Sequence, residues 1–138
     1  MPGSSTELPD RFRDSPVARL ATVRPDGRPH QVPVVFACSE TAIYVPIDGK
    51  PKSGKRLQRL VNIEHQPAVS LLVDQYADDW NQLWWVRVDG TAQPHEDPAT
   101  VSAGQQLLRQ KYPQYSDVAL QPHIIVITTH RVVTWSAG

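Results

Sequence analysis

The stretch RLVNIEHQPAVSLLVDQY, residues 59–76, changes its hydrophobic period within a few positions. Up to His65 the apolar side chains recur at the spacing of an α-helix, which we expect to begin near Ser53. Pro67 ends this helix, because a proline disfavours helical backbone at the residue before it. The short apolar run that follows predicts a strand over residues 67–76. The chain therefore passes directly from a helix into a strand at this point.

Upstream of this stretch, three segments have the apolar patterning of strands. The first two, residues 17–24 and 30–38, are separated by the turn sequence Pro-Asp-Gly at residues 25–27, which predicts a hairpin. The third, residues 41–47, follows a tight turn at residues 39 and 40. Because short connections favour neighbouring antiparallel strands, we expect these three strands to form a meander.

Two more helices flank the strands. A short one near the N-terminus is expected to be capped by Ser5 or Thr6 and to end at the Ser-Pro pair of residues 15 and 16. The other runs from Pro98 to about Tyr112, with Asp97 as its N-cap, because proline is favoured at the first helical position. All the predicted helices are short.

Two further strands complete the pattern, over residues 83–93 and over residues 123–135, the latter long and central. The total is six strands with few helices, and strands and helices do not alternate as they do in a parallel sheet. The sequence therefore predicts a mainly β fold, a six-stranded antiparallel barrel with short flanking helices.

Composition limits the classes of function. The 138 residues fit a single domain, residues 1–138, in which we expect residues 1–7 to be a flexible N-terminus. Lys plus Arg and Asp plus Glu both total 14, and this neutral balance argues against a nucleic-acid-coating protein. No stretch approaches the length of a membrane span, and the N-terminus lacks the apolar core of a signal peptide. The expected location is the cytoplasm, with neither nucleic acid nor membrane as a partner.

The most informative segment is GKPKSGKRLQRL, residues 49–60, which carries five basic side chains and no acidic one. It leaves a strand, passes through a turn and enters the helix, so cations and the free N–H groups of a helix N-terminus converge there. This arrangement suits an anionic ligand, above all a phosphate, whereas the alternative is a solvated basic helix face. The candidates for direct phosphate contact are Lys52, Ser53, Lys55 and Arg59, with Lys50 and Arg56 as secondary candidates.

Three of the four tryptophans, Trp80, Trp84 and Trp85, lie within six residues. In a strand over residues 83–93, Trp84 faces the core, whereas Trp85 lies on the opposite face with charged neighbours. Such a mixed face suits an interface or a cofactor cleft. The alternative is that these rings only cover the ends of the barrel.

Several kinds of catalytic centre have no counterpart here. The five histidines show no metal-ligand spacing, and the single Cys38 lies in an apolar run typical of a buried structural thiol, so we expect no metal site. The sequence has no nucleophile elbow, Walker loop or Rossmann fingerprint. A catalyst without an evident acid, base, nucleophile or metal depends on an organic cofactor, and the catalytic residues remain unknown.

Three stretches together resemble the pyridoxamine 5′-phosphate oxidase-like family of split β-barrels: ARLATVRPDGRPHQVPVVF (18–36), RLVNIEHQPAVSLLVDQY (59–76) and LWWVRVDGTAQ (83–93). The resemblance covers residues 8–135. Within the family, residues 74–87 are similar to the DxYxxDWxxLWWVR-like stretch of the deazaflavin (coenzyme F-420) branch of actinobacteria.

This resemblance implies a homodimer of split β-barrels with two cofactor sites at the subunit interface. The cofactor phosphate would lie against the basic segment and the tricyclic ring against the backbone around Ala21, Thr22, Val34 and Val35, with Trp85 facing the cofactor cleft. The strand arginine and lysine and the C-terminal arginine of the oxidase itself are missing here, so vitamin B6 oxidation is not implied.

The function implied is an oxidoreductase that transfers hydride from reduced coenzyme F-420 to a small electron-poor substrate. The proton source is solvent or a tyrosine, Tyr44 or Tyr76. The alternatives are an FMN-binding oxidoreductase of the same fold, a non-catalytic carrier of a cofactor or pigment, and a dimeric scaffold that binds no phosphate. The extra cations Lys50 and Arg56 favour F-420, whose anionic tail is the longer one.

Overall fold

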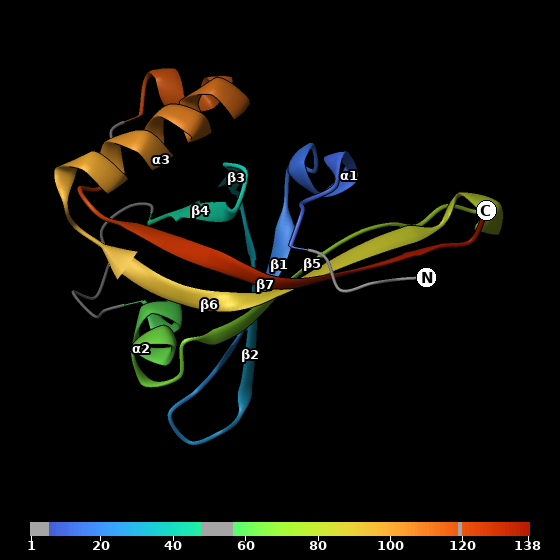
Figure 1. Ribbon diagram of the computed structural model, residues 1–138, viewed down its shortest axis with the longest axis horizontal. Helices are drawn as coiled ribbons and strands as arrows, with labels where there is room; N and C mark the ends of the chain where they lie inside the picture. The colour runs from blue at the N-terminus through green and yellow to red at the C-terminus, as the bar shows by residue number, and fades with distance from the viewer. Residues whose placement is uncertain (1–5, 48–56, 119) are drawn as a thin grey trace.

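The computed structural model describes residues 6–47, 57–118 and 120–138. Its strands form one antiparallel sheet in the order β2-β1-β5-β6-β7-β4-β3, strongly curved around a core (Figure 1). The strands are β1 (Ala18–Val23), β2 (Pro29–Val34), β3 (Ala37–Cys38), β4 (Ala42–Pro46), β5 (Ala68–Gln75), β6 (Trp84–His95) and β7 (Ile124–Ser136). The mainly β, antiparallel split-barrel prediction is confirmed.

The sheet has seven strands instead of the predicted six, because one predicted strand is interrupted at Phe36. The backbone N–H of Phe36 donates to Tyr112 Oη (3.1 Å), and its carbonyl accepts from Lys111 Nζ (2.9 Å). Because side chains satisfy these backbone groups, the predicted strand over residues 30–38 breaks there into β2 and β3. The Phe36 ring itself is fully buried and packs on Phe12.

The predicted meander is wrong, whereas the hairpin within it is confirmed. β1 pairs with β2 through a turn in which Gly27 has a φ of +90°, a conformation that favours glycine. β3 and β4 also form a hairpin, but it lies at the other edge of the sheet, beside β7. The break at Phe36 lets the chain cross from one edge of the sheet to the other.

The helices are α1 (Asp10–Arg13), α2 (Gln58–His65) and α3 (Pro98–Lys111), with the short 3-10 helices η1 (Trp80–Gln82) and η2 (Pro113–Ser116). Asp97 caps α3 by accepting from the Thr100 N–H (3.0 Å), as predicted. α1 begins after Pro9 without a side-chain cap, so the cap predicted at Thr6 is wrong, and Ser5 lies outside the described residues. In the described ranges, no helix is long and apolar enough to cross a membrane. The cytoplasmic location stays a prediction.

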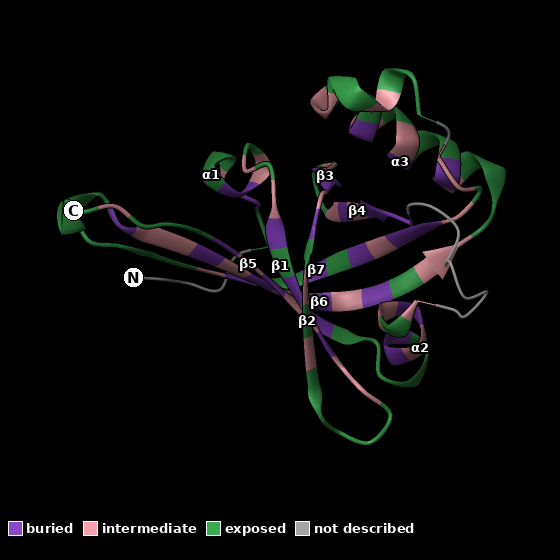
Figure 2. Cartoon of the chain, turned by 180° about the vertical axis from the view of Figure 1, so that it is seen from behind, coloured by how far each residue is buried: buried purple, intermediate pink, exposed green. Residues whose placement is uncertain are grey.

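The core lies on the concave face of the sheet. Along β6 the side chains of Val86 and Val88 are buried, as the predicted alternation requires, and they pair with β5 and β7 in the middle of the sheet (Figure 2). β5, β6 and β7 continue beyond the core as an arm that ends at η1 (Figure 1). The arm presents the opposite face of the sheet, with Trp85 beside Trp135, away from this core.

A β-bulge in the middle of the sheet depends on a glycine. The register between β6 and β7 shifts between Asp89 and Gly90, and a Cβ added at Gly90 would collide with the Thr128 carbonyl oxygen and lie 2.9 Å from Ile127 Cγ2. We expect Gly90→Ala to lower the free energy of unfolding by about 1–3 kcal/mol, because backbone must move. Gly104→Ala is the comparison: its Cβ would meet the side chains of Ile124 and Tyr44 rather than backbone, and we expect a smaller loss.

The measurement is urea unfolding of both variants followed by tryptophan fluorescence. Equal midpoints for Gly90→Ala and the unaltered protein would contradict the close packing of β6 on β7.

Candidate functional site

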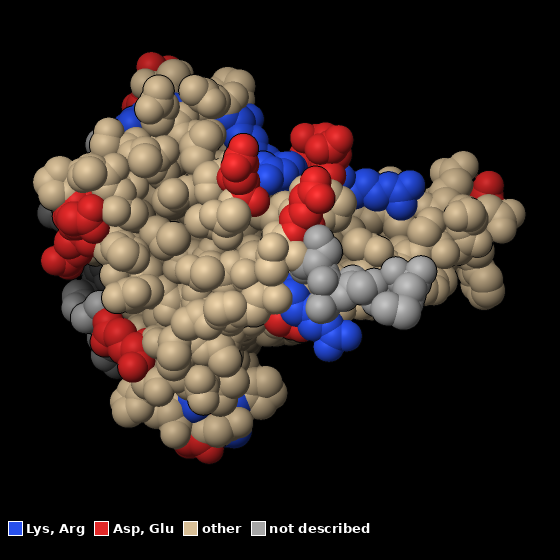
Figure 3. Space-filling view, in the orientation of Figure 1, with Lys and Arg blue, Asp and Glu red and all other residues tan. Residues whose placement is uncertain are grey.

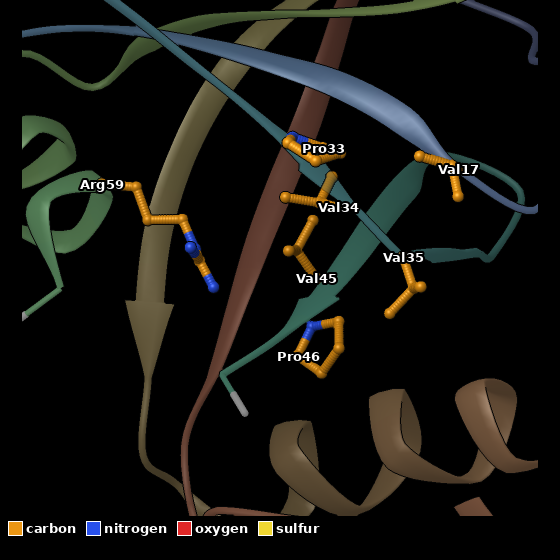
Figure 4. Close-up of a pocket in the computed structure, with 7 residues that line it drawn as sticks. All are labelled: Val17, Pro33, Val34, Val35, Val45, Pro46 and Arg59. Carbon is orange, nitrogen blue, oxygen red and sulfur yellow. The ribbon is translucent and has the colours of Figure 1, made fainter. Parts of the chain in front are cut away.

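A cavity of about 200 Å³ opens where β2, β4 and α2 approach one another (Figure 4). Its walls are Val17, Pro33, Val34, Val35, Val45, Pro46 and Arg59. Six of these seven side chains are apolar, and the seventh supplies a guanidinium group. In Figure 4 the Arg59 side chain extends from α2 toward Val34 and Val45. A cavity lined by apolar side chains and one cation suits a flat ring that carries an anionic substituent.

The two ends of the basic segment are both close in the chain to cavity-lining residues. Pro46 closes β4, and Arg59 is in the first turn of α2, so the residues between them connect two parts of the cavity wall. The predicted phosphate contacts Lys50, Lys52, Ser53, Lys55 and Arg56 lie outside the described residues. Their roles stay predictions, and Arg59 is the predicted cation that the structure describes.

Three predicted site residues come together in the cavity wall: Val34, Val35 and Arg59. Ala21 and Thr22 do not line it. Thr22 is only 2% exposed, and its hydroxyl accepts a hydrogen bond from Asn62 Nδ2 (2.9 Å), so its side chain faces α2. Contact between a ligand and the backbone of these two residues stays a prediction.

Trp85 does not line the cavity of its own chain. It lies on the arm, paired in register with Asp74 of β5 and with Trp135 of β7, on the face of the sheet opposite Val86. Trp135 is 42% exposed, and two more aromatic side chains, Tyr76 and Trp80, are more than 70% exposed near the tip of the arm. Trp84 packs against the core, as predicted, and the Arg11 guanidinium lies 5.1 Å from its ring centroid.

His30 is a polar neighbour of Arg59, whose positive charge acts on the imidazole. It pairs with Thr22 in the β1–β2 register, and its Nδ1 is buried without a hydrogen-bond partner among the described residues. Burial lowers the pKa of His30, and the positive charges of Arg24 and Arg59 lower it further. The lowered pKa favours the neutral imidazole, and an anion bound beside Arg59 would raise this pKa.

The two tyrosines considered as proton donors both have their side chains in other surroundings than the cavity. Tyr44 packs against the cluster of α3 with Val101 and Leu108, and Tyr76 is exposed on the arm. Neither is among the residues that line the cavity. Within the described residues there is also no group of three His, Cys, Asp or Glu side chains that could hold a metal ion.

Cys38 behaves as a structural thiol. It packs partly buried against the core, and this burial raises its pKa to about 11, although Lys111 and Arg13 lower it in part. Only about one thiol in a thousand is then ionised at pH 8. We expect Cys38 to react with a disulfide reagent at pH 8 about a hundredfold more slowly in the native protein than in guanidinium chloride. Similar rates in the two states would show that the thiol is accessible and ionised.

Comparisons with known proteins place this geometry in a family. The family model of pyridoxamine 5′-phosphate oxidase matches residues 5–136, so the chain belongs to this family of split β-barrels. Among curated proteins, none matches the chain.

Solved structures of low sequence identity share the fold. The chain is 22% identical to the conserved hypothetical protein Rv2991 from Mycobacterium tuberculosis, with a TM-score of 0.76, over 96% of this chain and 88% of that one. It is 22% identical to an FAD-binding protein from Mesorhizobium loti (TM-score 0.64; 88% and 86% covered). It is also 22% identical to an F-420 reductase (TM-score 0.62; 91% and 98% covered). At this identity the likeness establishes the fold.

Of the cavity wall, sequence reasoning missed Val17, Pro33, Val45 and Pro46. These side chains are apolar, so no local pattern distinguishes a cavity wall from a core position. Asn62 was missed as well, although a polar residue between the apolar Leu60 and Ile63 is a signal for a buried hydrogen bond.

Proposed function

We propose that this protein is a coenzyme F-420-dependent oxidoreductase that reduces a small, electron-poor organic substrate. The observation that carries the proposal is the cavity whose apolar walls face the Arg59 guanidinium. The similarity to an F-420 reductase and the DxYxxDWxxLWWVR-like stretch support the deazaflavin as the cofactor. FMN is the alternative, since it also offers a phosphate and a tricyclic ring, and the similarity to an FAD-binding protein supports a flavin.

The residues of the cavity fit such a group. Val34, Val35 and Val45 offer apolar contact to a ring and exclude water from it, whereas Arg59 offers N–H donors to an anionic oxygen. When bound, the reduced deazaflavin supplies a hydride, and it transfers two electrons at once. The protein then has to bind and orient the reactants in a dry site, which requires no nucleophile or metal.

We infer that the working form is a homodimer and that its subunits meet through the outer face of β5, β6 and β7. Trp85 and Trp135 lie side by side on this face, and Leu72 and Val133 continue it through their pairing with Arg87. Figure 3 shows a broad area without charged side chains over the middle of the molecule, bordered by charges. The outer face itself also carries charge, since Arg87 and Asp89 form an ion pair on it (3.1 Å), and such a mixed aromatic and charged face suits an interface between subunits. In such a dimer, Trp85 of one protomer faces the cofactor cleft of its partner.

A turnover assay separates an enzyme from a carrier. The protein is mixed with reduced F-420 and a panel of acceptors with electron-poor C=C or C=O bonds, and absorbance at the deazaflavin band is followed. The proposal predicts acceptor-dependent reoxidation that requires the protein and is lost in Arg59→Met. Tight binding of the cofactor with no acceptor consumed would instead support a carrier.

A further inference from the structure

A buried polar pair joins α2 to the sheet beside the cavity. Asn62 is completely buried and donates from Nδ2 to Thr22 Oγ1 of β1 (2.9 Å). Its Oδ1 accepts from Gln58 Nε2 (2.8 Å), one turn earlier in α2. Across the described ranges, the buried polar side chains are Asn62, Thr22 and Thr129. Two of these three therefore meet in one contact between helix and strand.

Such a hydrogen-bonded pair fixes the rotation of a helix about its axis, which apolar packing alone does not. The neighbouring side chains Leu60 and Ile63 bury α2 against the core, but hydrophobic contact is non-directional and tolerates small rotations of the helix. A buried amide that loses its partner is costly, so one rotation of α2 is strongly preferred. The Asn62–Thr22 hydrogen bond therefore sets the orientation of α2 on β1.

The same contacts stabilise the first turn of α2. Its N-cap position, Leu57, offers no side-chain hydrogen bond to the free N–H groups of the turn. The bond from Gln58 to Asn62 joins side chains four residues apart, a spacing that stabilises a helix. Arg59 lies in this first turn, three residues before Asn62 and on a neighbouring part of the helix surface. Its Cα position therefore follows from the orientation that Asn62 fixes.

We propose that Asn62 and Thr22 are positioning residues, whose buried hydrogen bond holds Arg59 at the cavity for the anionic part of the ligand. The inference rests on the proposed function and extends it. In this proposal the Thr22 side chain orients α2 and does not contact the cofactor, since its hydroxyl faces α2. The pair acts on binding through Arg59, so its effect disappears when Arg59 is absent.

A double-mutant cycle tests this coupling, with oxidised F-420 as the probe and fluorescence as the readout. Thr22→Val removes the hydroxyl with little change of shape, and we expect it to weaken F-420 binding about tenfold when Arg59 is present. In the Arg59→Met background, the same substitution is expected to change the Kd by no more than about twofold. Thr22→Ser keeps the hydroxyl and is expected to bind as the unaltered protein does.

The matched control is Thr129→Val, the same substitution at another buried threonine, whose Oγ1 has no hydrogen-bond partner in the part of the chain that the structure describes. We expect it to leave the Kd unchanged. Circular dichroism confirms that each variant is folded at the titration temperature.

The outcomes separate the inference from the proposed function. If Arg59→Met itself leaves F-420 binding unchanged, the proposed function fails, and with it the positioning role. If Arg59→Met weakens binding but Thr22→Val does not, the positioning role is overturned and the proposed function stands. Equal losses from Thr22→Val in both backgrounds, or an equal loss from Thr129→Val, would also overturn it, because the effect would then come from general destabilisation.

Discussion

Replacement of Trp135 by arginine is expected to convert the homodimer that we propose into monomers. Trp135 is 42% exposed in the single chain and lies beside Trp85 on the outer face of the arm, which we infer to be the subunit interface. A buried aromatic side chain at the centre of an interface commonly contributes 2 kcal/mol or more, so the dimer Kd should rise by about thirtyfold or more. An unpaired guanidinium buried there adds to the loss.

The measurement is light scattering coupled to size exclusion over a range of protein concentrations. Val118→Arg is the matched control, because Val118 is also an exposed apolar residue but lies after η2, outside the arm. We expect a dimer for this control and a monomer for Trp135→Arg, which should also lose cofactor binding if Trp85 completes the partner's site. A dimer in both variants would place the subunit interface elsewhere.

Arg59→Met is expected to weaken binding of the deazaflavin about 10- to 100-fold. The substitution keeps an unbranched side chain in the cavity wall but removes the donors that face the anionic part of the ligand. Hydrogen bonds to charged groups contribute about 1.5–3 kcal/mol, which corresponds to this range of Kd. Binding to the unaltered protein should also weaken as salt is raised, and this salt dependence should be smaller in the variant.

Arg109→Met is the control for this second prediction. Arg109 is an exposed arginine on α3 that does not line the cavity, so its loss changes the net charge by the same amount. Titrations at low and moderate ionic strength separate the two arginines. Equal effects of the two substitutions would mean that the ligand responds to overall charge, and that Arg59 makes no specific contact.

Much of the fold could be predicted from the sequence because local patterns, such as the alternation of apolar residues and the helix caps, determine it. The alternation along residues 83–93 predicted that Val86 and Val88 face the core, and Asp97 before Pro98 predicted the start of α3. The break at Phe36 could not be predicted in this way. Its cause is a pair of side chains, Lys111 and Tyr112, that lie about 75 residues further along the chain.

Sequence reasoning singled out Arg59, a residue of the cavity wall, from its charge and position. Arg59 stands in a basic segment at the start of a helix, and this pattern indicated an anion site. The apolar walls come from separate segments around β2 and β4, and only the arrangement of the sheet brings Val34 and Val45 together. The buried contact of Asn62 with Thr22 joins residues forty positions apart, so it too depends on the tertiary fold.

The central claim is that this split β-barrel binds the deazaflavin coenzyme through its basic segment and Arg59. The most direct test is a parallel fluorescence titration with F-420 and with FMN, using the unaltered protein and a variant with Lys52, Lys55 and Arg59 replaced by alanine. We expect micromolar binding of F-420, weaker binding of FMN, and loss of F-420 binding in the variant. Preference for FMN would assign the protein to the flavin branch, and binding of neither cofactor would contradict the account.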